Sequence, residues 1–294
     1  MPTKKLFCLF LILTGCTSSH YLTLAPSEIA SFQAKKPPHT VLVLGGGGSK
    51  GFAHLGAIRE LEAAGIRPDL IIGCSAGAIV GALYADEPEV AEIDKALLSM
   101  KRSDILDTSY FNFRFGFVKG HALEDFMEKN LRSKTFDELK IPLIVIATDL
   151  YTGELIELSS KEIPRAVRAS CAFPGVFEPV LYQGRYLIDG GVTSPLPVEI
   201  AKKYGARVII AINLTEKLTE AKPSHLFGVA KRAIEIAYRK FIAQAIAMAD
   251  IVIQMEFQDV GTFSDHMNEH MYEHGRTKAK AAIPAIKKKL EQVN

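Results

Sequence analysis

The chain has 294 residues, enough for one large domain or two small ones with a proper core. Apolar residues make up 48% and charged residues 23%, and the formal net charge is +2, which is ordinary for a globular protein and too small a charge to suggest a nucleic-acid binder. No repeat period and no biased tract is present, which excludes repeat, collagen-like and disordered architectures. Four cysteines stand far apart without a CxxC pair, so neither a zinc site nor a disulfide framework is expected: Cys8, Cys16, Cys74 and Cys171.

The N-terminal segment carries the marks of a secretory signal peptide. Lys4 and Lys5 precede the apolar run of residues 6–13, which is far shorter than the roughly 20 residues of a membrane-spanning helix. The run that ends at Cys16, Leu-Thr-Gly-Cys, resembles a bacterial lipoprotein box, in which the cysteine is lipid-modified and becomes the new N-terminus. We therefore predict a lipoprotein signal peptide over residues 1–15, with a plain signal peptide or a buried strand as alternatives.

Cleavage before Cys16 would remove both lysines and leave no net charge. Membrane attachment would then rest on acyl chains, at about 0.8 kcal/mol for each buried CH₂, rather than on a basic patch. Residues 16–40, with Pro37-Pro38, are interpreted as a tether. By resemblance to Gram-negative sorting, Thr17 rather than Asp after the cysteine indicates the outer membrane. The expected location is thus the bacterial cell envelope, and the outer membrane in a Gram-negative organism.

Beyond residue 40, short apolar segments alternate with helical patterns. Residues 41–44 form a β-branched run that ends in four glycines, and residues 52–64 carry apolar side chains at helical spacing. The same periodicities predict strands at 70–73, 143–147, 208–212 and 251–254, and helices at 76–84 and 226–249. In the last helix, apolar residues at steps of three and four predict an amphipathic face: Ala230, Ile234, Ala237, Phe241, Ala245 and Met248.

Apolar strands separated by helices favour an α/β fold of three layers, with a mainly parallel sheet between helices on both faces. In such a sheet the chemistry lies at the carboxyl ends of the strands, and three segments fall there. The first is the glycine-rich loop from Gly45 to Gly51, whose backbone N–H groups can converge on an anion at a helix N-terminus. With Asp69 further on, the loop also matches a dinucleotide-binding pattern, but Lys50 stands where a P-loop needs its second glycine.

The second segment is Gly73-Cys74-Ser75-Ala76-Gly77. This is G-x-S-x-G between a predicted strand and a predicted helix, the context that a nucleophile elbow requires. A serine that merely caps the helix is the alternative. The strand–turn–helix context favours a nucleophile.

The third segment is Asp189-Gly190-Gly191, which follows the apolar run of residues 186–188. A plain hairpin turn is the alternative, but a nucleophilic serine needs a base. Four histidines follow Asp189 in the order of a hydrolase triad, yet they lie in a polar linker and a charged tail. We interpret all four as surface residues: His225, His266, His270 and His274.

Taken together and in order, these three segments resemble the motifs of the patatin-like phospholipases. G-G-G-x-[RK]-G is residues 46–51, G-x-S-x-G is residues 73–77, and D-G-[AG] is residues 189–191. Residues 51–56 and 168–175 also resemble the bacterial branch of the family. The resemblance covers residues 41–200 closely, as a catalytic domain, and we expect residues 201–294 to complete the same domain.

The resemblance implies a Ser–Asp dyad without histidine: Ser75 as nucleophile, Asp189 as proton acceptor, and an oxyanion hole formed by Gly46, Gly47 and Gly48. It implies no metal and no cofactor. Lys50, where arginine is frequent, keeps the charge but loses the planar fork. An aspartate with an ordinary pKa near 4 is a poor base, so burial should raise the pKa, or the carboxylate mainly orients the serine. Asp149, at another strand end but without a glycine pair, is the rival.

The sequence therefore predicts a lipid acyl hydrolase of the phospholipase, lysophospholipase or esterase type, which acts on a phospholipid or other acyl ester through an acyl-enzyme. The alternatives are a catalytically silent lipid-binding lipoprotein and, less favoured, a dinucleotide-binding oxidoreductase, which explains neither Ser75 nor Asp189. One aromatic stretch favours a half-buried strand, with a lid or lipid-facing patch as the alternative: Tyr110, Phe111, Phe113, Phe115 and Phe117.

Overall fold

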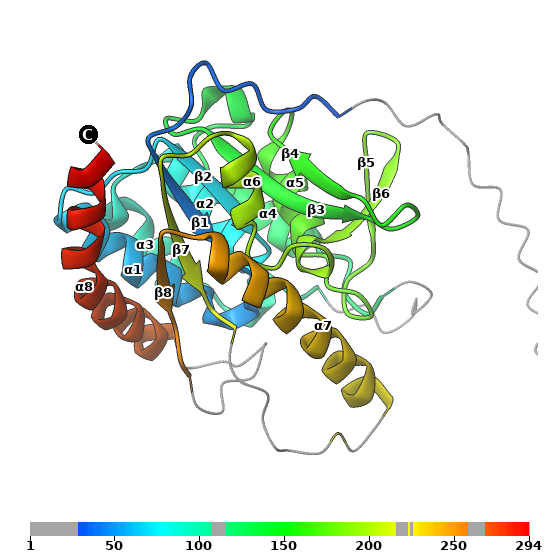
Figure 1. The fold of residues 1–294 in the computed structure, drawn as a ribbon. Helices are drawn as coiled ribbons and strands as arrows, with labels where there is room; N and C mark the ends of the chain where they lie inside the picture. Colours follow the sequence, from blue (N-terminus) through cyan, green and yellow to red (C-terminus); the bar gives the residue numbers. More distant parts are fainter. Residues whose placement is uncertain (1–28, 108–115, 216–222, 224–225, 258–267, 294) are drawn as a thin grey trace, which may run out of the picture.

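A computed structural model of the chain describes residues 29–107, 116–215, 223, 226–257 and 268–293. Within these ranges eight strands form one sheet, and helices cover both of its faces (Figure 1). The strands are β1 (Thr40–Leu44), β2 (Leu70–Cys74), β3 (Leu143–Asp149), β4 (Leu155–Leu158), β5 (Val180–Tyr182), β6 (Arg185–Asp189), β7 (Val208–Asn213) and β8 (Ile251–Gln254).

The strands pair in the succession β5-β6-β3-β2-β1-β7-β8, and β4 also pairs with β3. β2 and β6 pair with successive stretches of β3, residues 143–146 and 147–149. The five strands β1, β2, β3, β7 and β8 run parallel, while β4 and β6 pair antiparallel with β3, and β5 with β6. This confirms the predicted mainly parallel sheet. β1, β2, β3 and β7 are buried at every position because both faces of the sheet are covered.

Side chains that alternate along β1 show the two cores. Leu42 and Leu44 belong to the larger apolar cluster, which includes residues of α1 (Phe52–Ala63), α2 (Ala76–Asp86) and α8 (Asn268–Val293). Val41 and Val43 belong to the second cluster, which includes residues of α6 (Val198–Lys203) and α7 (Leu226–Met248). The larger cluster also takes in residues of α3 (Val90–Leu98), α4 (His121–Asn130) and α5 (Ile163–Ser170). Three layers follow, as the sequence predicts.

The C-terminal segment that the sequence indicates to be a charged tail is a helix of 26 residues, α8. It packs against α1, and glycines make the close approach: a Cβ on Gly56 would lie 1.9 Å from the carbonyl oxygen of Tyr272, and one on Gly275 would lie 2.1 Å from that of Ala53. The outer face of α8 is rich in lysine, which gives the sequence the polar character of a tail.

Only part of the apolar face predicted for residues 226–249 is buried: Ala245 is buried and Met248 half-buried, and both pack in the second cluster. α7 buries Ile242 and Ala245 and half-buries Tyr238 against the sheet, whereas Ala237 and Phe241 of the predicted face are exposed. Both faces of this helix contain apolar residues, so periodicity alone does not distinguish them. None of the described helices is both long and apolar enough to cross a membrane.

Candidate active site

Ser75 sits on a sharp turn between β2 and α2. Its backbone is in the left-handed region, with φ of 52°, a strained conformation for a residue other than glycine. A hydrogen bond helps to hold it there, because the Ser75 N–H donates to the Ser170 Oγ at 2.8 Å, and the Ser170 hydroxyl donates in turn to the Ile146 carbonyl at 2.6 Å. The turn therefore has the geometry of a nucleophile elbow.

The two flanking glycines of this turn are required by close packing. A Cβ on Gly73 would lie 2.6 Å from the carbonyl oxygen of Gly77, and one on Gly77 would lie 2.1 Å from that of Leu44. Neither carbonyl could move without breaking the sheet or the helix. The G-x-S-x-G pattern is thus explained by the approach of α2 to the carboxyl end of β1.

Asp189 reaches this turn because β2 and β6 pair with the same edge of β3, end to end. Cys74 lies opposite Ile146 and Asp189 lies opposite the next residue, Ala147. β4 occupies the other edge of β3 across both positions. The antiparallel β6 therefore delivers the last residue of its strand to the carboxyl end of β2.

The structure brings Ser75 and Asp189 together. The Ser75 hydroxyl donates to Asp189 Oδ2 at 2.7 Å, and the Gly191 N–H donates to Oδ1 at 2.7 Å. Burial raises the pKa of Asp189 to about 6, although the hydrogen bonds from Ser75 and Gly191 pull it down. At neutral pH the carboxylate is thus ionised, yet far more basic than an exposed aspartate.

The turn after Asp189 is packed as tightly as the elbow. A Cβ on Gly190 would lie 2.2 Å from the Ile146 carbonyl oxygen, so this position excludes other residues. The Thr148 hydroxyl donates to the Asp189 carbonyl at 3.0 Å. These contacts fix the direction in which the carboxylate points.

The glycine-rich loop lies over the serine. A Cβ on Gly46 would lie 3.5 Å from Ser75 Cβ, while Gly51 ends the short 3-10 helix Gly48–Gly51 that leads into α1. The Gly46 N–H donates to the Pro195 carbonyl at 2.9 Å, so it is not available to an oxyanion. This corrects the predicted set of three donors. The N–H groups of Gly47 and Gly48 have no hydrogen-bond partner among the described residues.

His54 of α1 supports the loop from below, a role that the sequence analysis missed. Its ring is fully buried, and Nε2 lies 2.8 Å from the Gly45 carbonyl oxygen, which can only accept, so Nε2 carries the proton. Burial lowers the pKa of His54 to about 4, against the effect of the bond to Gly45. Nδ1 has no partner among the described residues. His54 is therefore a neutral positioning residue.

Tyr238 of α7 is a second neighbour of the site that the sequence analysis missed. Its hydroxyl lies 2.7 Å from the point that a Cβ of Gly191 would occupy, and Asp189 Oδ1 lies 3.0 Å from the same point. The oxygen is buried and has no hydrogen-bond partner in the described part of the chain. Burial, followed by the charge of Asp189, raises the pKa of this phenol. No short-range motif marks Tyr238, because it comes from a distant helix.

Two buried cysteines flank the dyad without pairing. Cys74 precedes Ser75, and Cys171 follows the supporting Ser170. Burial raises the pKa of both thiols, and the negative charge of Asp189 raises it further. They are therefore protonated at neutral pH and act as small apolar side chains.

The rival carboxylate, Asp149, is occupied by structural contacts. Oδ1 accepts the N–H groups of Tyr151 and Thr152 at 2.9 and 3.0 Å, and Oδ2 accepts Arg185 at 3.0 Å. Burial opposes the shift, but these bonds together lower the pKa of Asp149. Asp149 therefore closes the β3–β4 turn rather than serving Ser75.

The other candidates lie away from the site or outside the described residues. Asp69 precedes β2 and accepts the Thr40 N–H at 2.8 Å, so it is at the amino edge of the sheet, opposite to where a dinucleotide's ribose would need it. His270 is exposed and His274 half-buried on α8, where His274 packs on Phe257. Cys16, His225, His266 and residues 108–115 of the aromatic stretch are not among the described residues.

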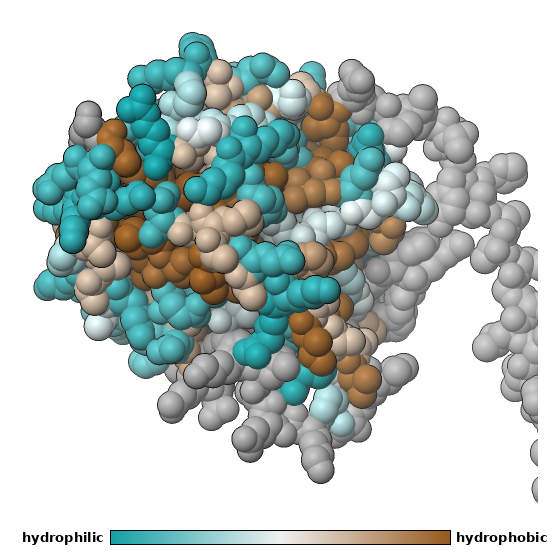
Figure 2. Space-filling model, in the orientation of Figure 1, coloured by the Kyte–Doolittle hydropathy of each residue, from teal (hydrophilic) through white to brown (hydrophobic). Residues whose placement is uncertain are grey.

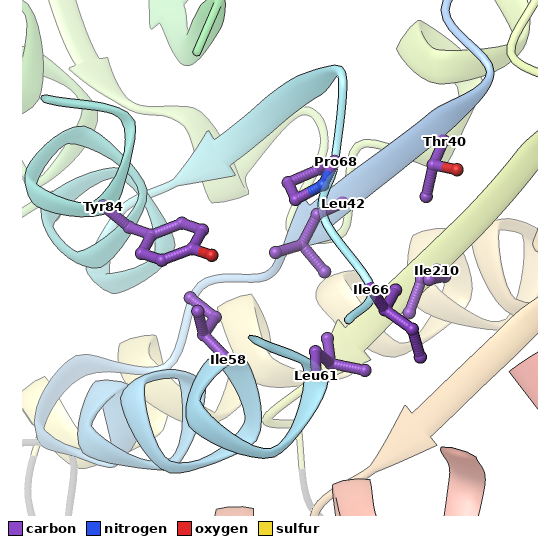
Figure 3. Close-up of a pocket in the computed structure, with 8 residues that line it drawn as sticks. All are labelled: Thr40, Leu42, Ile58, Leu61, Ile66, Pro68, Tyr84 and Ile210. Atoms are coloured by element: carbon purple, nitrogen blue, oxygen red, sulfur yellow. The ribbon is translucent and has the colours of Figure 1, made fainter. Parts of the chain in front are cut away.

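A small apolar cavity also lies at the amino edge. It is lined by residues of β1, α1 and the segment before β2, among them Leu42, Ile58 and Pro68 (Figure 3). Ser75 stands at the opposite end of β2, so this cavity is separate from the dyad. Among the described residues, no three His, Cys, Asp or Glu side chains gather as a metal ion would require.

Comparison with protein families supplies the context for this geometry. The model of the patatin-like phospholipases matches residues 42–202, more than half of the chain. The chain belongs to the patatin-like phospholipase family. The match includes the glycine-rich loop, the Ser75 elbow and the Asp189 turn, and it ends before α7.

Several curated proteins are similar to this member of the family. An uncharacterized NTE family protein of Mycobacterium tuberculosis is 33% identical over 189 residues, which are 64% of this chain and 51% of that protein. The human patatin-like phospholipase domain-containing protein 6 is 32% identical over 181 residues, 59% of this chain and 13% of that protein. A lysophospholipase, NTE1, of Scheffersomyces stipitis is 34% identical over 177 residues, 59% of this chain and 11% of that protein. The chain spans about half the length of the first of these relatives and less of the others.

Among solved structures, VipD from Legionella pneumophila superposes with a TM-score of 0.58 at 16% identity. The superposition covers 90% of this chain and 70% of VipD. At this identity the likeness concerns the fold alone, and it agrees with the three-layer patatin-like architecture.

Proposed function

We propose that this patatin-like protein hydrolyses carboxylic esters of lipids, with Ser75 as nucleophile and Asp189 as proton acceptor. The observation that carries the proposal is the 2.7 Å hydrogen bond from a serine on a strained elbow to a buried carboxylate. Both residues belong to the part of the chain that matches the family. A serine that only capped α2 would need neither the strained backbone nor the hydrogen bond to Asp189.

The first half of the reaction forms an acyl-enzyme. Ser75 Oγ attacks the ester carbonyl carbon while its proton passes to Asp189 Oδ2. The carbonyl oxygen becomes an oxyanion, and the N–H groups of Gly47 and Gly48 lie on the loop above Ser75 to receive it. In serine hydrolases one such donor lowers the barrier by on the order of 3 kcal/mol. The C–O bond then breaks, and the alcohol leaves with a proton from Asp189.

The second half releases the fatty acid. A water molecule attacks the acyl carbon and gives a proton to Asp189, and the C–O bond to Ser75 Oγ then breaks as Asp189 returns this proton to Oγ. The raised pKa of Asp189 suits both halves, since a carboxylate of pKa about 6 holds a proton better than one of pKa near 4. His54 and Ser170 position the loop and the elbow.

Hydrolysis of a panel of phospholipids, lysophospholipids and neutral acyl esters tests the proposal. The wild-type chain should release fatty acid from at least one of them, and Ser75→Ala should release none. Ser99→Ala, at an exposed serine that caps α3, is the matched control and should match wild type. A chain that binds these lipids but turns over none would instead be a silent lipid-binding protein.

We also propose that the protein is a lipoprotein of the bacterial cell envelope, anchored through Cys16. The proposal rests on the lipoprotein box and on the resemblance of residues 51–56 and 168–175 to the bacterial branch. The 23 residues from Thr17 to His39 form the segment between this cysteine and β1. A lipid anchor would hold the hydrolase near its substrate.

A further inference from the structure

The outward side of α7 is apolar, which is the reverse of a usual surface helix. At 100° per residue, six residues lie opposite the inward-facing Tyr238, and all six are exposed: Val229, Ala233, Ile236, Lys240, Ala243 and Ala247. We call these six the outer face of α7. Val229 and Ile236 each expose 54% of their surface. One charge, Lys240, interrupts this face.

The helix is also basic. Its 23 residues contain four basic side chains and one acidic one, Glu235, a net charge of +3 in a chain whose net charge is +2. Arg232 pairs with Glu235 at 3.3 Å, while Lys240 is exposed on the outer face itself. An apolar face that carries a lysine, on a helix with an excess of basic residues, is typical of helices that lie in the interface of an anionic bilayer. An apolar contact with a second protein would not need this excess of positive charge.

The outer face of α7 stands at the edge of the sheet where the dyad lies. Tyr238, on the inward side, touches the turn after Asp189, and the helix runs from there out past the body of the molecule, with apolar surface on its projecting part (Figures 1 and 2). Leu150 and Tyr151, which follow β3 beyond the level of Ser75, are also exposed at this edge. Two elements thus carry exposed apolar residues at the edge of the sheet where Ser75 stands.

We propose that the outer face of α7 docks on an anionic lipid bilayer and so presents the dyad to lipid in that bilayer. The inference rests on the proposed lipid substrate. Val229 and Ile236 enter the boundary between head groups and acyl chains, and Lys240 pairs with lipid phosphates. Because Tyr238 of the same helix lies against the Asp189 turn, docking fixes the dyad at a set distance from the membrane surface.

The chain contains no tryptophan, so one introduced indole reports on one position. Ile236→Trp in the full chain is mixed with phosphatidylcholine–phosphatidylglycerol vesicles whose acyl chains carry bromine, a quencher of indole fluorescence. We expect the indole emission to shift to the blue and to be quenched. Both effects should be smaller with vesicles of phosphatidylcholine alone. Leu181→Trp, at an exposed apolar position on β5, is the matched control. Its emission should stay unquenched even if a lipid anchor holds the N-terminal segment at the membrane.

Two results of this measurement would overturn the docking proposal. One is an Ile236→Trp emission that the brominated lipid leaves unchanged, or quenches no more than that of Leu181→Trp. The other is a blue shift that grows with protein concentration in the absence of vesicles, because a second copy of the chain then covers the face.

Hydrolysis rates test the docking proposal independently of fluorescence. Ile236→Asp and Lys240→Glu should each lower hydrolysis of vesicle lipid about tenfold and leave hydrolysis of a soluble short-chain ester unchanged. Lys287→Glu, on the exposed side of α8, should change neither rate. Equal vesicle rates for wild type and Ile236→Asp contradict docking, whereas a wild-type chain that cleaves neither substrate contradicts the proposed hydrolase itself.

Discussion

The buried carboxylate of Asp189 sets the expected pH dependence of hydrolysis. Its pKa of about 6 means that the residue can accept the serine proton only above that pH. We predict that kcat/KM rises about tenfold per pH unit below pH 6 and levels off above it. A pH–rate profile of the wild-type chain on a soluble ester checks this prediction. A profile that is flat from pH 4 to pH 8 would contradict the assignment of Asp189 as base.

His54 makes the free energy of unfolding depend on pH, because burial lowers its pKa. Its pKa is about 4 in the folded chain and near 6.5 when unfolded, so the unfolded state binds the proton first as the pH falls. Up to about 3 kcal/mol of stability is present above pH 6.5 and is lost on the way down to pH 4. We predict that His54→Gln, which keeps a donor for Gly45, flattens the urea-unfolding free energy over this range. An unchanged pH dependence would place the titrating group elsewhere.

At the scale of residues, the motifs lead directly to the pair Ser75 and Asp189, and the hydrogen bond between them agrees with that expectation. The sequence does not show that the Gly46 N–H is occupied, because its partner Pro195 is far along the chain. Tyr238 is hidden for the same reason. Local patterns identify a group that a turn needs, but not a group that a distant element contributes.

At the scale of elements, the crossing of α1 and α8 depends on two glycines. We predict that Gly56→Ala lowers the free energy of unfolding by about 1–3 kcal/mol, because the new methyl group would overlap the Tyr272 carbonyl and push the helices apart. Lys287→Ala, at an exposed position on α8, should change it by less than about 0.5 kcal/mol. Urea denaturation of the three proteins measures both. A Gly56→Ala chain as stable as wild type would contradict this prediction, because the crossing would then have room for a methyl group.

The elements differ in how well the sequence predicts them. The strands with continuous β-branched residues, such as β1 and β8, are predicted within a residue of their bounds. α8 is missed because its exposed side is charged and because glycine makes part of its contact with α1. α7 is predicted as a helix, but the predicted face coincides only in part with the buried one, since apolar residues occur on both of its sides.

At the scale of the whole molecule, attachment to the membrane is the expectation that the N-terminal sequence makes. We predict that the mature protein begins at an acylated Cys16. Mass spectrometry of the protein purified from the cells that make it checks this, and Cys16→Ser should abolish the modification and leave the protein unprocessed. An unmodified N-terminus, or a chain that retains Met1, would contradict the prediction.

The arrangement of β2 and β6 end to end along β3 is a property of the whole sheet. No local sequence pattern predicts this arrangement, because β6 is antiparallel and its partner, β3, lies about forty residues earlier in the chain. Its consequence is that a serine and an aspartate 114 positions apart share a hydrogen bond. We infer that these two residues act as one catalytic unit.

The most direct test of this claim compares the hydrolysis rates of Ser75→Ala, Asp189→Asn and Asp149→Asn on one soluble ester, with folding of each confirmed by circular dichroism. Nucleophile and base act together, so Asp189→Asn should lose activity by about a thousandfold or more, nearly as much as Ser75→Ala. Asp149→Asn, and alanine at His225, His266, His270 or His274, should stay within a few-fold of wild type. A folded Asp189→Asn chain that retains wild-type activity, or a folded histidine variant as inactive as Ser75→Ala, would contradict the dyad.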